Sequence, residues 1–563
     1  MIFTKSVLVL GSDTRSFLSV IRSFGRGGLT VDAAWTAPTS VARRSRYLRK
    51  VHDDLPAYSH TDLAWLDDLR HRVACEGYDF VVPTCDPVIL PLQAHRAELD
   101  TRRFYLLEDR VFQITNDKGR TYELARSEGV PVPDQVLVHT TAQALTAAEQ
   151  FGYPVILKPL SSFTLLDGDN KQHVRRAVDR HALRRILELM LPKGAVLVQS
   201  HFQGIGVGVE VLARGGQILA SFQHQRVHEP LRGGGSSYRK SVQLHPELLE
   251  ATRKLIQALK YTGVAMVEFR FDPACDRFVL IEINGRFWGS LPLAVAARAD
   301  FPLWLYQMWV EGRDQFPAKT RVGLYCRNLL NDLDWISENL RAQGTIPTSR
   351  VIGELWNLVT LRERFDTLVL DDVRPGMEEL RLIGRRLVDF SHKRFLSSTV
   401  FASLRRVVWW TAIRRLRNAQ KLAFVCKGNI CRSPFAAAYA RCTLPNVEIR
   451  SAGYYPLANR ASPAEAVAAA ALFDVDLSQS RSSVIDENLI QRADVVLVFD
   501  YENYSKLRSA YPDSDGKLIF LGLLGGESTF IEDPYGGSLR DFVATYSRIV
   551  RAVDRIGHLQ RKS

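Results

Sequence analysis

Cys426-Lys427-Gly428-Asn429-Ile430-Cys431-Arg432-Ser433-Pro434 is the stretch around which this sequence is organised. It follows the apolar run 422–425 and precedes an alanine-rich segment at 435–440. This order predicts a strand, a tight loop and a helix, so that backbone N–H groups of the loop converge at a helix N-terminus, where oxyanions bind. Because Cys426 and Arg432 share the loop, a thiolate and a planar guanidinium can face one phosphate group. We therefore predict a phosphate-binding loop with a cysteine nucleophile.

The loop resembles the signature of the low-molecular-weight protein tyrosine phosphatases, Cys-x-Gly-Asn-x-Cys-Arg-Ser-Pro, close to the start of that domain. The likeness covers residues 421–563 and continues through Ser451-Ala452-Gly453, Arg481-Ser482, Asp500 and Asp533-Pro534-Tyr535-Gly536. The alternative is a buried structural cysteine beside a surface arginine. A long motif in strand, loop and helix context is far more specific than two spaced residues, and it favours the phosphatase.

The resemblance implies a role for each polar residue of the loop. Cys426 is the implied nucleophile, Arg432 the ligand of the phosphate oxygens and Asp533 the general acid. Asn429 is implied to fix the loop through side-chain hydrogen bonds, and Ser433 to donate to the thiolate. The fold implied is α/β with a parallel sheet. The implied substrate is phosphotyrosine or a related phosphate monoester, on a phosphorylated protein or a small molecule.

Length and composition limit the remaining possibilities. With 563 residues the chain exceeds what one hydrophobic core usually supports, so we expect several folding units. Seven scattered cysteines, an odd number without paired metal-ligand spacing, favour a reducing compartment over a disulfide framework or a zinc site. The first residues lack the pattern of a signal peptide, and no apolar run has the length of a membrane span. We therefore expect a cytoplasmic protein.

The positive charge of the chain is concentrated in one segment. The formal net charge is +13, and residues 381–421 contain eleven Lys and Arg against one acid, Asp389, which gives 11 − 1 = +10. This distribution argues against a nucleic-acid-binding protein. Within the segment, residues 395–417 have the pattern of a basic amphipathic helix. Such a helix either packs as a connector or docks on an anionic membrane, and residues 393–417 are the predicted place of any peripheral membrane contact.

The N-terminal region has a β-α-β pattern. We predict strands at 5–10, 30–35 and 78–84 and a helix at 17–24. Cys85-Asp86 follows the third of these strands, at the edge where open α/β sheets collect ligands. The turn after the first strand lacks the full glycine fingerprint of a dinucleotide site, so we interpret it as a plain strand-helix turn.

Downstream, polar residues occur in an order that suits nucleotide phosphates and a metal ion. Lys118 begins a predicted helix, and Lys158 follows a predicted buried strand; both can neutralise phosphate charge. Two predicted antiparallel strands then carry hard oxygen ligands for Mg²⁺. These ligands are Glu268, Glu282 and Asn284.

This arrangement resembles the ATP-grasp enzymes, especially the branch that contains carbamoyl phosphate synthetase and biotin carboxylase. The likeness covers residues 1–315 and implies ATP and Mg²⁺ as cofactors. By position, Lys118 and Lys158 correspond to the phosphate-contacting lysines, and Arg286 corresponds to the arginine that stabilises an acyl phosphate. Glu268, Glu282 and Asn284 correspond to the metal ligands. The implied adenine-binding hinge is formed by Gln199, Ser200, His201 and Phe202.

These patterns predict an α/β multidomain protein with four parts. Residues 1–112 form a pre-ATP-grasp α/β domain, and residues 113–318 form an ATP-grasp α+β domain. Residues 319–420 form a basic, mainly helical connector, and residues 421–563 form the phosphatase domain with its parallel sheet.

The resulting prediction is a bifunctional cytoplasmic enzyme. An ATP- and Mg-dependent ligase would activate a small-molecule carboxylate as an acyl phosphate for attack by an amine, and a cysteine-dependent phosphatase would cleave phosphate esters. Two alternatives remain open. In one, the ATP-grasp part is a non-catalytic nucleotide sensor that regulates the phosphatase; in the other, the protein is a phosphatase docked on the inner membrane surface.

Overall fold

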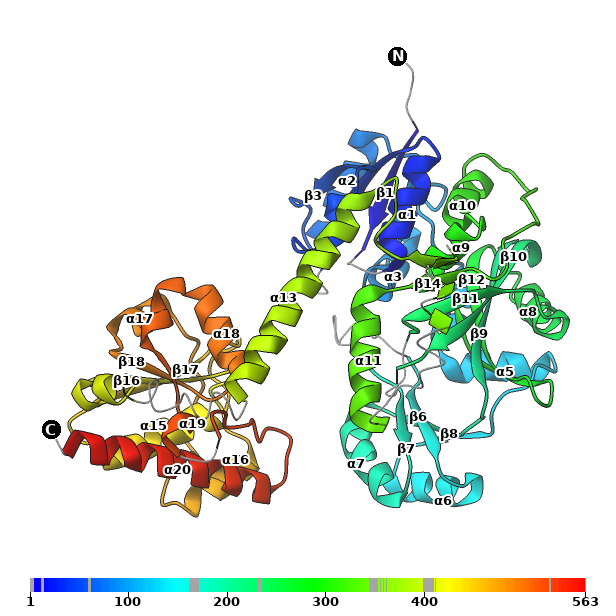
Figure 1. Ribbon diagram of the computed structural model, residues 1–563. Coiled ribbons are helices and arrows are strands. Elements are labelled where there is room, and N and C mark those ends of the chain that lie inside the picture. The colour runs from blue at the N-terminus through cyan, green and yellow to red at the C-terminus, as the bar shows by residue number, and fades with distance from the viewer. Residues whose placement is uncertain are drawn as a thin grey trace. The chain divides into compact units, whose positions relative to one another are not determined.

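The computed structural model describes most of the chain in two compact units. The units are Met1–Ile383 and Gly384–Ser563. The described residues are 5–11, 15–58, 62–161, 172–230, 235–343, 353–354, 356–357, 359–360, 362–397, 410, 412–525 and 528–561. Figure 1 shows the elements of each unit.

The first unit begins with a parallel sheet of order β3-β2-β1-β4. Its strands are β1 (Ser6–Leu10), β2 (Thr30–Ala34), β3 (Leu48–His52) and β4 (Phe80–Pro83), and its helices are α1 (Arg15–Arg26), α2 (Ala64–Glu76) and α3 (Asp86–Ala94). Helix α1 packs through Phe17, Val20, Ile21 and Phe24, which share one helical face and are fully buried. Strand β1 lies between β2 and β4, so the strand order reverses between β1 and β4.

A second, antiparallel sheet of order β5-β8-β6-β7 follows. It consists of β5 (Gln135–Val138), β6 (Val155–Pro159), β7 (Arg175–Ala177) and β8 (Val196–Ser200), with α6 (Thr141–Phe151) and α7 (Arg180–Met190). Alanines of α6 and leucines of α7 pack with β6 and β8 in one small core. Helices α4 (Asp109–Asn116) and α5 (Lys118–Ser127) precede this sheet, and α5 begins at the residue that the sequence predicts.

The largest sheet has seven strands in the order β13-β12-β9-β10-β11-β14-β15. Its long strands are β9 (Ile205–Arg214), β10 (Gln217–His228), β12 (Gly263–Asp272) and β13 (Arg277–Asn284). The shorter strand β11 (Tyr238–Val242) pairs with β10. Helix α8 (Pro246–Ala258) packs on β9 and β12 through Leu248, Leu255 and Ile256. Helices α9 (Leu291–Ala296) and α10 (Phe301–Trp309) share a core with α1.

Part of the stretch 319–420, which the sequence predicts to be a mainly helical connector, belongs to this sheet. Strands β14 (Tyr325–Arg327) and β15 (Glu363–Phe365) extend the sheet beyond β11. Helices α11 (Leu329–Gln343) and α13 (Val373–Ser397) belong to the same stretch. Most of the predicted basic helix at 395–417 lies outside the described residues. Among the residues that the structure does describe, no helix combines the length and apolar character that crossing a bilayer requires.

The second unit contains a four-stranded parallel sheet of order β17-β16-β18-β19. Its elements are β16 (Lys421–Cys426), α15 (Arg432–Thr443), β17 (Glu448–Gly453), α16 (Ala464–Ala471), α17 (Glu487–Arg492), β18 (Val495–Val498), α18 (Tyr501–Ala510), β19 (Leu518–Phe520), α19 (Gly522–Gly525) and α20 (Leu539–Arg561). Leu422 and Phe424 of β16 pack with α15, α16 and α20, whereas Ala423 and Val425 pack with α17 and α18. This alternation buries both faces of the sheet, as parallel sheets require.

Candidate active sites

The predicted nucleophile lies at the carboxyl end of a central strand. Cys426 is the last residue of β16 and is buried. Its Sγ lies 3.0 Å from Ser433 Oγ and accepts the backbone N–H of Asn429 at 3.3 Å. Ser433 stands in the first turn of α15, so the sulfur faces a helix N-terminus. A negative charge on Sγ is therefore stabilised by an amide, a hydroxyl and the helix dipole.

Asn429 holds the loop in an unusual backbone conformation. Its φ of 51° lies in the left-handed region, which asparagine tolerates better than most side chains do. Its Nδ2 donates to Ser433 Oγ at 2.8 Å and to Ser451 Oγ at 3.1 Å, and its Oδ1 accepts the backbone N–H of Ser483 at 2.9 Å. A Cβ at Gly453 would lie 2.8 Å from Asn429 N, so only glycine fits beside the loop.

Arg432 brings the predicted general acid to the loop. Its side chain is 1% exposed, and Nη2 donates to Asp533 Oδ2 at 2.7 Å. Nη1 donates to Asp500 Oδ2 at 2.5 Å and to the carbonyl of Ile531 at 2.9 Å. Burial lowers the pKa of Arg432, but Asp533 and Asp500 outweigh it and raise the pKa above its ordinary value. Arg432 is therefore a permanent cation beside Cys426.

The predicted metal ligands lie on two paired strands of the first unit. Glu268 of β12 and Glu282 of β13 are cross-strand partners, and Asn284 Nδ2 donates to Glu282 Oε1 at 3.0 Å. Burial raises the pKa of Glu282, but nearby cations and the Asn284 bond outweigh it, so that the pKa is lowered. These cations are Lys118, Lys158 and Arg286. The structure thus gathers these predicted residues around one carboxylate.

The two lysines reach Glu282 from different elements. Lys118 is the first residue of α5, whose N-cap is Asp117, and it lines a pocket with Glu282, Asn284 and Arg286. Lys158 lies on β6, and its Nζ donates to the Tyr122 hydroxyl at 3.0 Å. Two ammonium groups from separate elements therefore face the carboxylate strands.

Arg286 has a partner that sequence analysis did not identify. Its Nε donates to Asp86 Oδ1 at 2.6 Å, and its Nη1 donates to the carbonyl of Phe287 at 3.0 Å. Asp86 is the first residue of α3, at the carboxyl end of β4. The sequence does place Asp86 at a ligand-binding sheet edge, but it gives no sign of a partner 200 residues away.

A second missed residue is Arg226, which pairs with Glu268 at 2.6 Å. Arg226 lies on β10, so its side chain must cross β9 to reach β12. It crosses at Gly206, where a Cβ would lie 2.5 Å from Arg226 Cδ. Burial, with Glu282 nearby, raises the pKa of Glu268 despite Arg226. The glycine-rich start of β9 is the sequence signal for this crossing.

The predicted adenine hinge lies at the end of β8. Gln199 is buried and its Nε2 donates to Gln135 Oε1 at 2.5 Å, while the Ser200 N–H donates to the carbonyl of Asp134. His201 and Phe202 follow the strand, and burial lowers the pKa of His201. The hinge role of these residues stays a prediction.

The donor set at Glu282 fits Mg²⁺. Two carboxylates on paired strands and one amide offer hard oxygen atoms, and the unfavourable burial of Glu268 beside Glu282 is what a cation would relieve. Within the described part of the chain, no group of three or more His, Cys, Asp and Glu could hold a metal ion. The predicted set is consistent with this, because its third ligand is Asn284.

Residues 421–562 match the family described as low molecular weight phosphotyrosine protein phosphatase. The probable low molecular weight protein-tyrosine-phosphatase EpsP of Ralstonia nicotianae is 37% identical over 130 residues, which are 23% of this chain and 88% of that protein. This chain belongs to the low-molecular-weight protein-tyrosine-phosphatase family. The phosphatase Etp of Escherichia coli is 31% identical over 128 residues, 23% of this chain and 86% of that protein.

The first unit of the chain matches a second family. Residues 193–331 match the family described as ATP-grasp in the biosynthetic pathway with Ter operon. A biotin carboxylase structure from Campylobacter jejuni is 15% identical, covers 57% of this chain and 74% of that chain, and gives a TM-score of 0.45. Both predicted family resemblances are confirmed, and so is the α/β multidomain fold. The chain combines an ATP-grasp domain with a low-molecular-weight phosphatase, and both are enzyme families.

Proposed function

We propose that the chain is a bifunctional enzyme with a cysteine-dependent phosphatase and a ligase that activates a carboxylate as an acyl phosphate. For the phosphatase, the supporting observation is that Arg432 lies between the thiol loop and Asp533. For the ligase, it is the convergence of Lys118, Lys158 and Arg286 on Glu282. The cytoplasmic location stays a prediction.

In the phosphatase, Cys426 Sγ attacks the phosphorus of a phosphotyrosine or related ester, and the bond to the leaving oxygen breaks. Asp533 gives its proton to that oxygen, and Arg432 with the loop amides holds the other phosphate oxygens. Water then attacks the phosphorus and gives a proton to Asp533, and the S–P bond breaks, which releases inorganic phosphate and restores the Cys426 thiolate and the acid. The bond from Arg432 to Asp533 supports this assignment, because it puts the acid beside the phosphate ligand.

In the ligase, Lys118 and Lys158 bind phosphate oxygens of ATP while the γ-phosphoryl group passes to the substrate carboxylate. Residues 199–202 bind the adenine, and Arg286 stabilises the acyl phosphate. Mg²⁺ held by Glu268, Glu282 and Asn284 would supply positive charge to the phosphate oxygens. An amine then attacks the acyl carbon and releases inorganic phosphate.

Two assays on the full chain test the proposal. Hydrolysis of p-nitrophenyl phosphate should be abolished in Cys426→Ser, with ATP turnover as the internal control. ADP release should rise when pooled carboxylic acids and amines are added to the chain with Mg·ATP. If Cys426→Ser keeps its rate, the nucleophile is wrongly assigned; if no pool raises ADP release, the nucleotide-sensor alternative is favoured. Sedimentation with anionic vesicles tests the membrane contact predicted for residues 393–417.

A further inference from the structure

The guanidinium of Arg15, at the start of α1, lies beside the loop that follows Arg286 and has no role in the proposed reactions. Arg15 Nη1 donates to the carbonyl of Ser236 at 2.5 Å. Among the residues that the structure describes, no carboxylate lies within ion-pair distance of Arg15. Burial and the neighbouring guanidinium of Arg239 lower the pKa of Arg15 to about 10, which still leaves it cationic at neutral pH. A cation in this position favours an anion beside it.

Arg239 brings a second guanidinium to the same carbonyl. Its Nη1 donates to Ser236 O at 3.2 Å, so the guanidiniums of Arg15 and Arg239 share one acceptor. Arg239 also forms a buried ion pair with Asp366. Arg226, its partner on β10, is neutralised by Glu268. Within the described residues Arg15 is thus the cation of this group without a direct ion pair, although the charge of Asp366 acts on it from further away.

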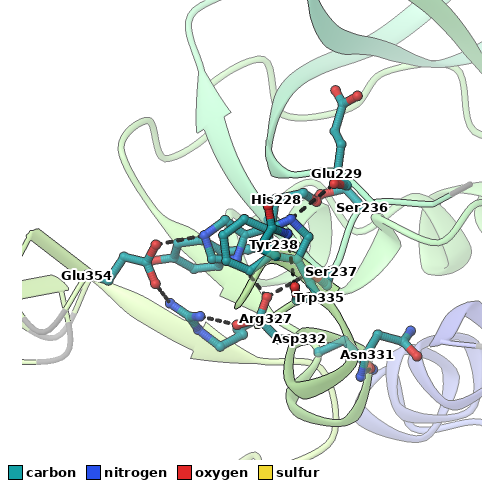
Figure 2. Close-up of polar contacts among 12 residues, drawn as sticks. His228, Glu229, Ser236, Ser237, Tyr238, Arg327, Asn331, Asp332, Trp335 and Glu354 are labelled. Carbon is teal, nitrogen blue, oxygen red and sulfur yellow. Dashed lines mark hydrogen bonds and ion pairs between the residues drawn. The ribbon is translucent and has the colours of Figure 1, made fainter. Parts of the chain in front are cut away.

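The carbonyl that orients both arginines is held rigidly. Ser236 Oγ donates to the carbonyl of His228 at 2.7 Å, and Ser237 Oγ donates to Asp332 Oδ1 at 2.7 Å. His228 Nδ1 also contacts Asp332 Oδ1 at 2.7 Å, and its ring stacks on Trp335 with centroids 3.7 Å apart. Figure 2 shows these side chains packed around the backbone at Ser236 and Ser237. The direction of Arg15 is therefore fixed by contacts outside the nucleotide site.

Arg15 also lies where the fold of the first sheet places ligands. Open α/β sheets bind ligands beyond the carboxyl ends of their strands, at the point where the strand order reverses. Here that point lies between β1 and β4. Arg15 follows β1 and Asp86 follows β4, and Asp86 holds Arg286 of the ligase site. A Cβ at Gly289 would lie 3.5 Å from Arg15 Cζ, so Arg15 and Asp86 both meet the loop at 285–290.

We propose that Arg15, supported by Arg239, binds a second anionic group of the ligase substrate. The substrate is then a carboxylic acid that also carries another carboxylate or a phosphate. One carboxylate faces Arg286 and is activated, and the other group receives the forked N–H donors of Arg15. This subsite rests on the proposed ligase function, and it narrows the substrate class from any acid to a dianionic one.

Calorimetric titration of the full chain, with ADP and Mg²⁺ present, tests the subsite without turnover. The probes are succinate, glutarate and adipate, each beside its monomethyl ester, and 3-phosphonopropanoate beside propanoate. We expect at least one dianion to bind about thirtyfold more tightly than its monoanionic match. The monoanion cannot form the charge pair with Arg15, and the absence of one buried charge pair weakens binding by about this factor. The phosphonate arm distinguishes a phosphate-bearing substrate from a diacid.

Three variants assign that preference to Arg15. Arg15→Gln should remove it, and Arg15→Lys, which keeps the charge but not the fork, should retain part of it. Arg26→Gln removes the same charge from the other end of α1, where it pairs with Asp371, and should keep the full preference. Circular dichroism and thermal unfolding confirm that each variant is folded; should Arg15→Gln fail to fold, Arg15→Lys still reports the loss.

Three outcomes would overturn the subsite. In the first, every dianion binds with the same affinity as its monoanionic match. In the second, no dianion binds. In the third, Arg15→Gln still prefers the dianion as strongly as the parent protein does. ADP release measured in parallel separates this result from the parent proposal. Arg15-dependent binding of a dianion without any stimulated ADP release supports the subsite and refutes the ligase, whereas ADP release driven equally by monoacids supports the ligase and refutes the subsite.

Discussion

Replacing Asn429 by alanine should slow the phosphatase strongly, although Asn429 takes no part in bond making. The side chain is 2% exposed, and it connects the loop to Ser433, Ser451 and Ser483. Alanine removes these hydrogen bonds and must adopt a φ of 51° without the local bonds that help asparagine there. The loop that presents Cys426 and Arg432 should then leave its phosphate-binding conformation for part of the time.

The magnitude follows from two terms. A non-glycine residue in the left-handed region costs about 1–2 kcal/mol. The part-buried hydrogen bond from the Ser483 N–H is also lost, and loss of such a bond costs about 0.5–1.5 kcal/mol. Together these terms disfavour the loop conformation by roughly 1.5–3.5 kcal/mol, which lowers kcat/KM by at least about tenfold. Asn429→Gly loses the same bonds but accepts the positive φ, so it should be the milder change by about 1 kcal/mol, or about fivefold.

Initial rates with p-nitrophenyl phosphate measure both variants, and ATP turnover by the first unit serves as the internal control. Equal losses in Asn429→Ala and Asn429→Gly would show that the backbone conformation is not what Asn429 contributes. Rates unchanged from the parent protein in both would refute the larger claim that these hydrogen bonds hold the loop.

Three further predictions concern the charged groups. In single-turnover measurements, Asp533→Ala should slow the cleavage of phenyl phosphate far more than the cleavage of a nitrophenyl phosphate ester, because the poorer leaving group needs the proton. If the rates for both esters fall by the same factor, Asp533 is not the general acid. Glu282→Gln should abolish Mg²⁺-dependent ADP release and spare phosphatase activity, and unchanged release would refute the metal assignment. At Asp332, burial raises the pKa but bonding to His228 and the charge of Arg327 outweigh it, so the pKa is lowered. Its stabilising effect should be complete above about pH 5 and lost as the pH falls through the folded value. Asp332→Asn should therefore flatten the acid side of a plot of unfolding midpoint against pH, and an unchanged slope would contradict this.

The phosphatase loop could be predicted because its chemistry is local in the sequence. The strand, the loop and the first turn of α15 are contiguous, and the motif fixes the order of Cys426, Asn429 and Arg432. The link from Arg432 to Asp533 spans 101 residues, and a family resemblance supplied it, not spacing. Periodicity also placed β1, β4 and α5, since buried runs and an amphipathic helix have clear patterns.

Other features could not be predicted because they depend on pairing between distant segments. Strands β14 and β15 have three residues each, too few for an alternating pattern. Strand β14 pairs with β11, and β15 pairs with β14, so both depend on partners from distant parts of the chain. The side chain of Arg226 can be placed over Gly206 only when the register between β9 and β10 is known. The ion pair of Asp86 with Arg286 joins two sheets. No local pattern contains such information.

That ion pair also gives Arg286 its direction. Asp86 accepts from Nε, and the carbonyl of Phe287 accepts from Nη1, so two sides of the guanidinium are occupied by the protein. Within the described residues Nη2 has no such acceptor, and Arg286 lines the same pocket as Lys118 and Glu282. The remaining N–H donors can thus serve a ligand. A carboxylate at the edge of the first sheet therefore orients an arginine in the ATP-grasp domain, and residues from both parts of the first unit line one pocket.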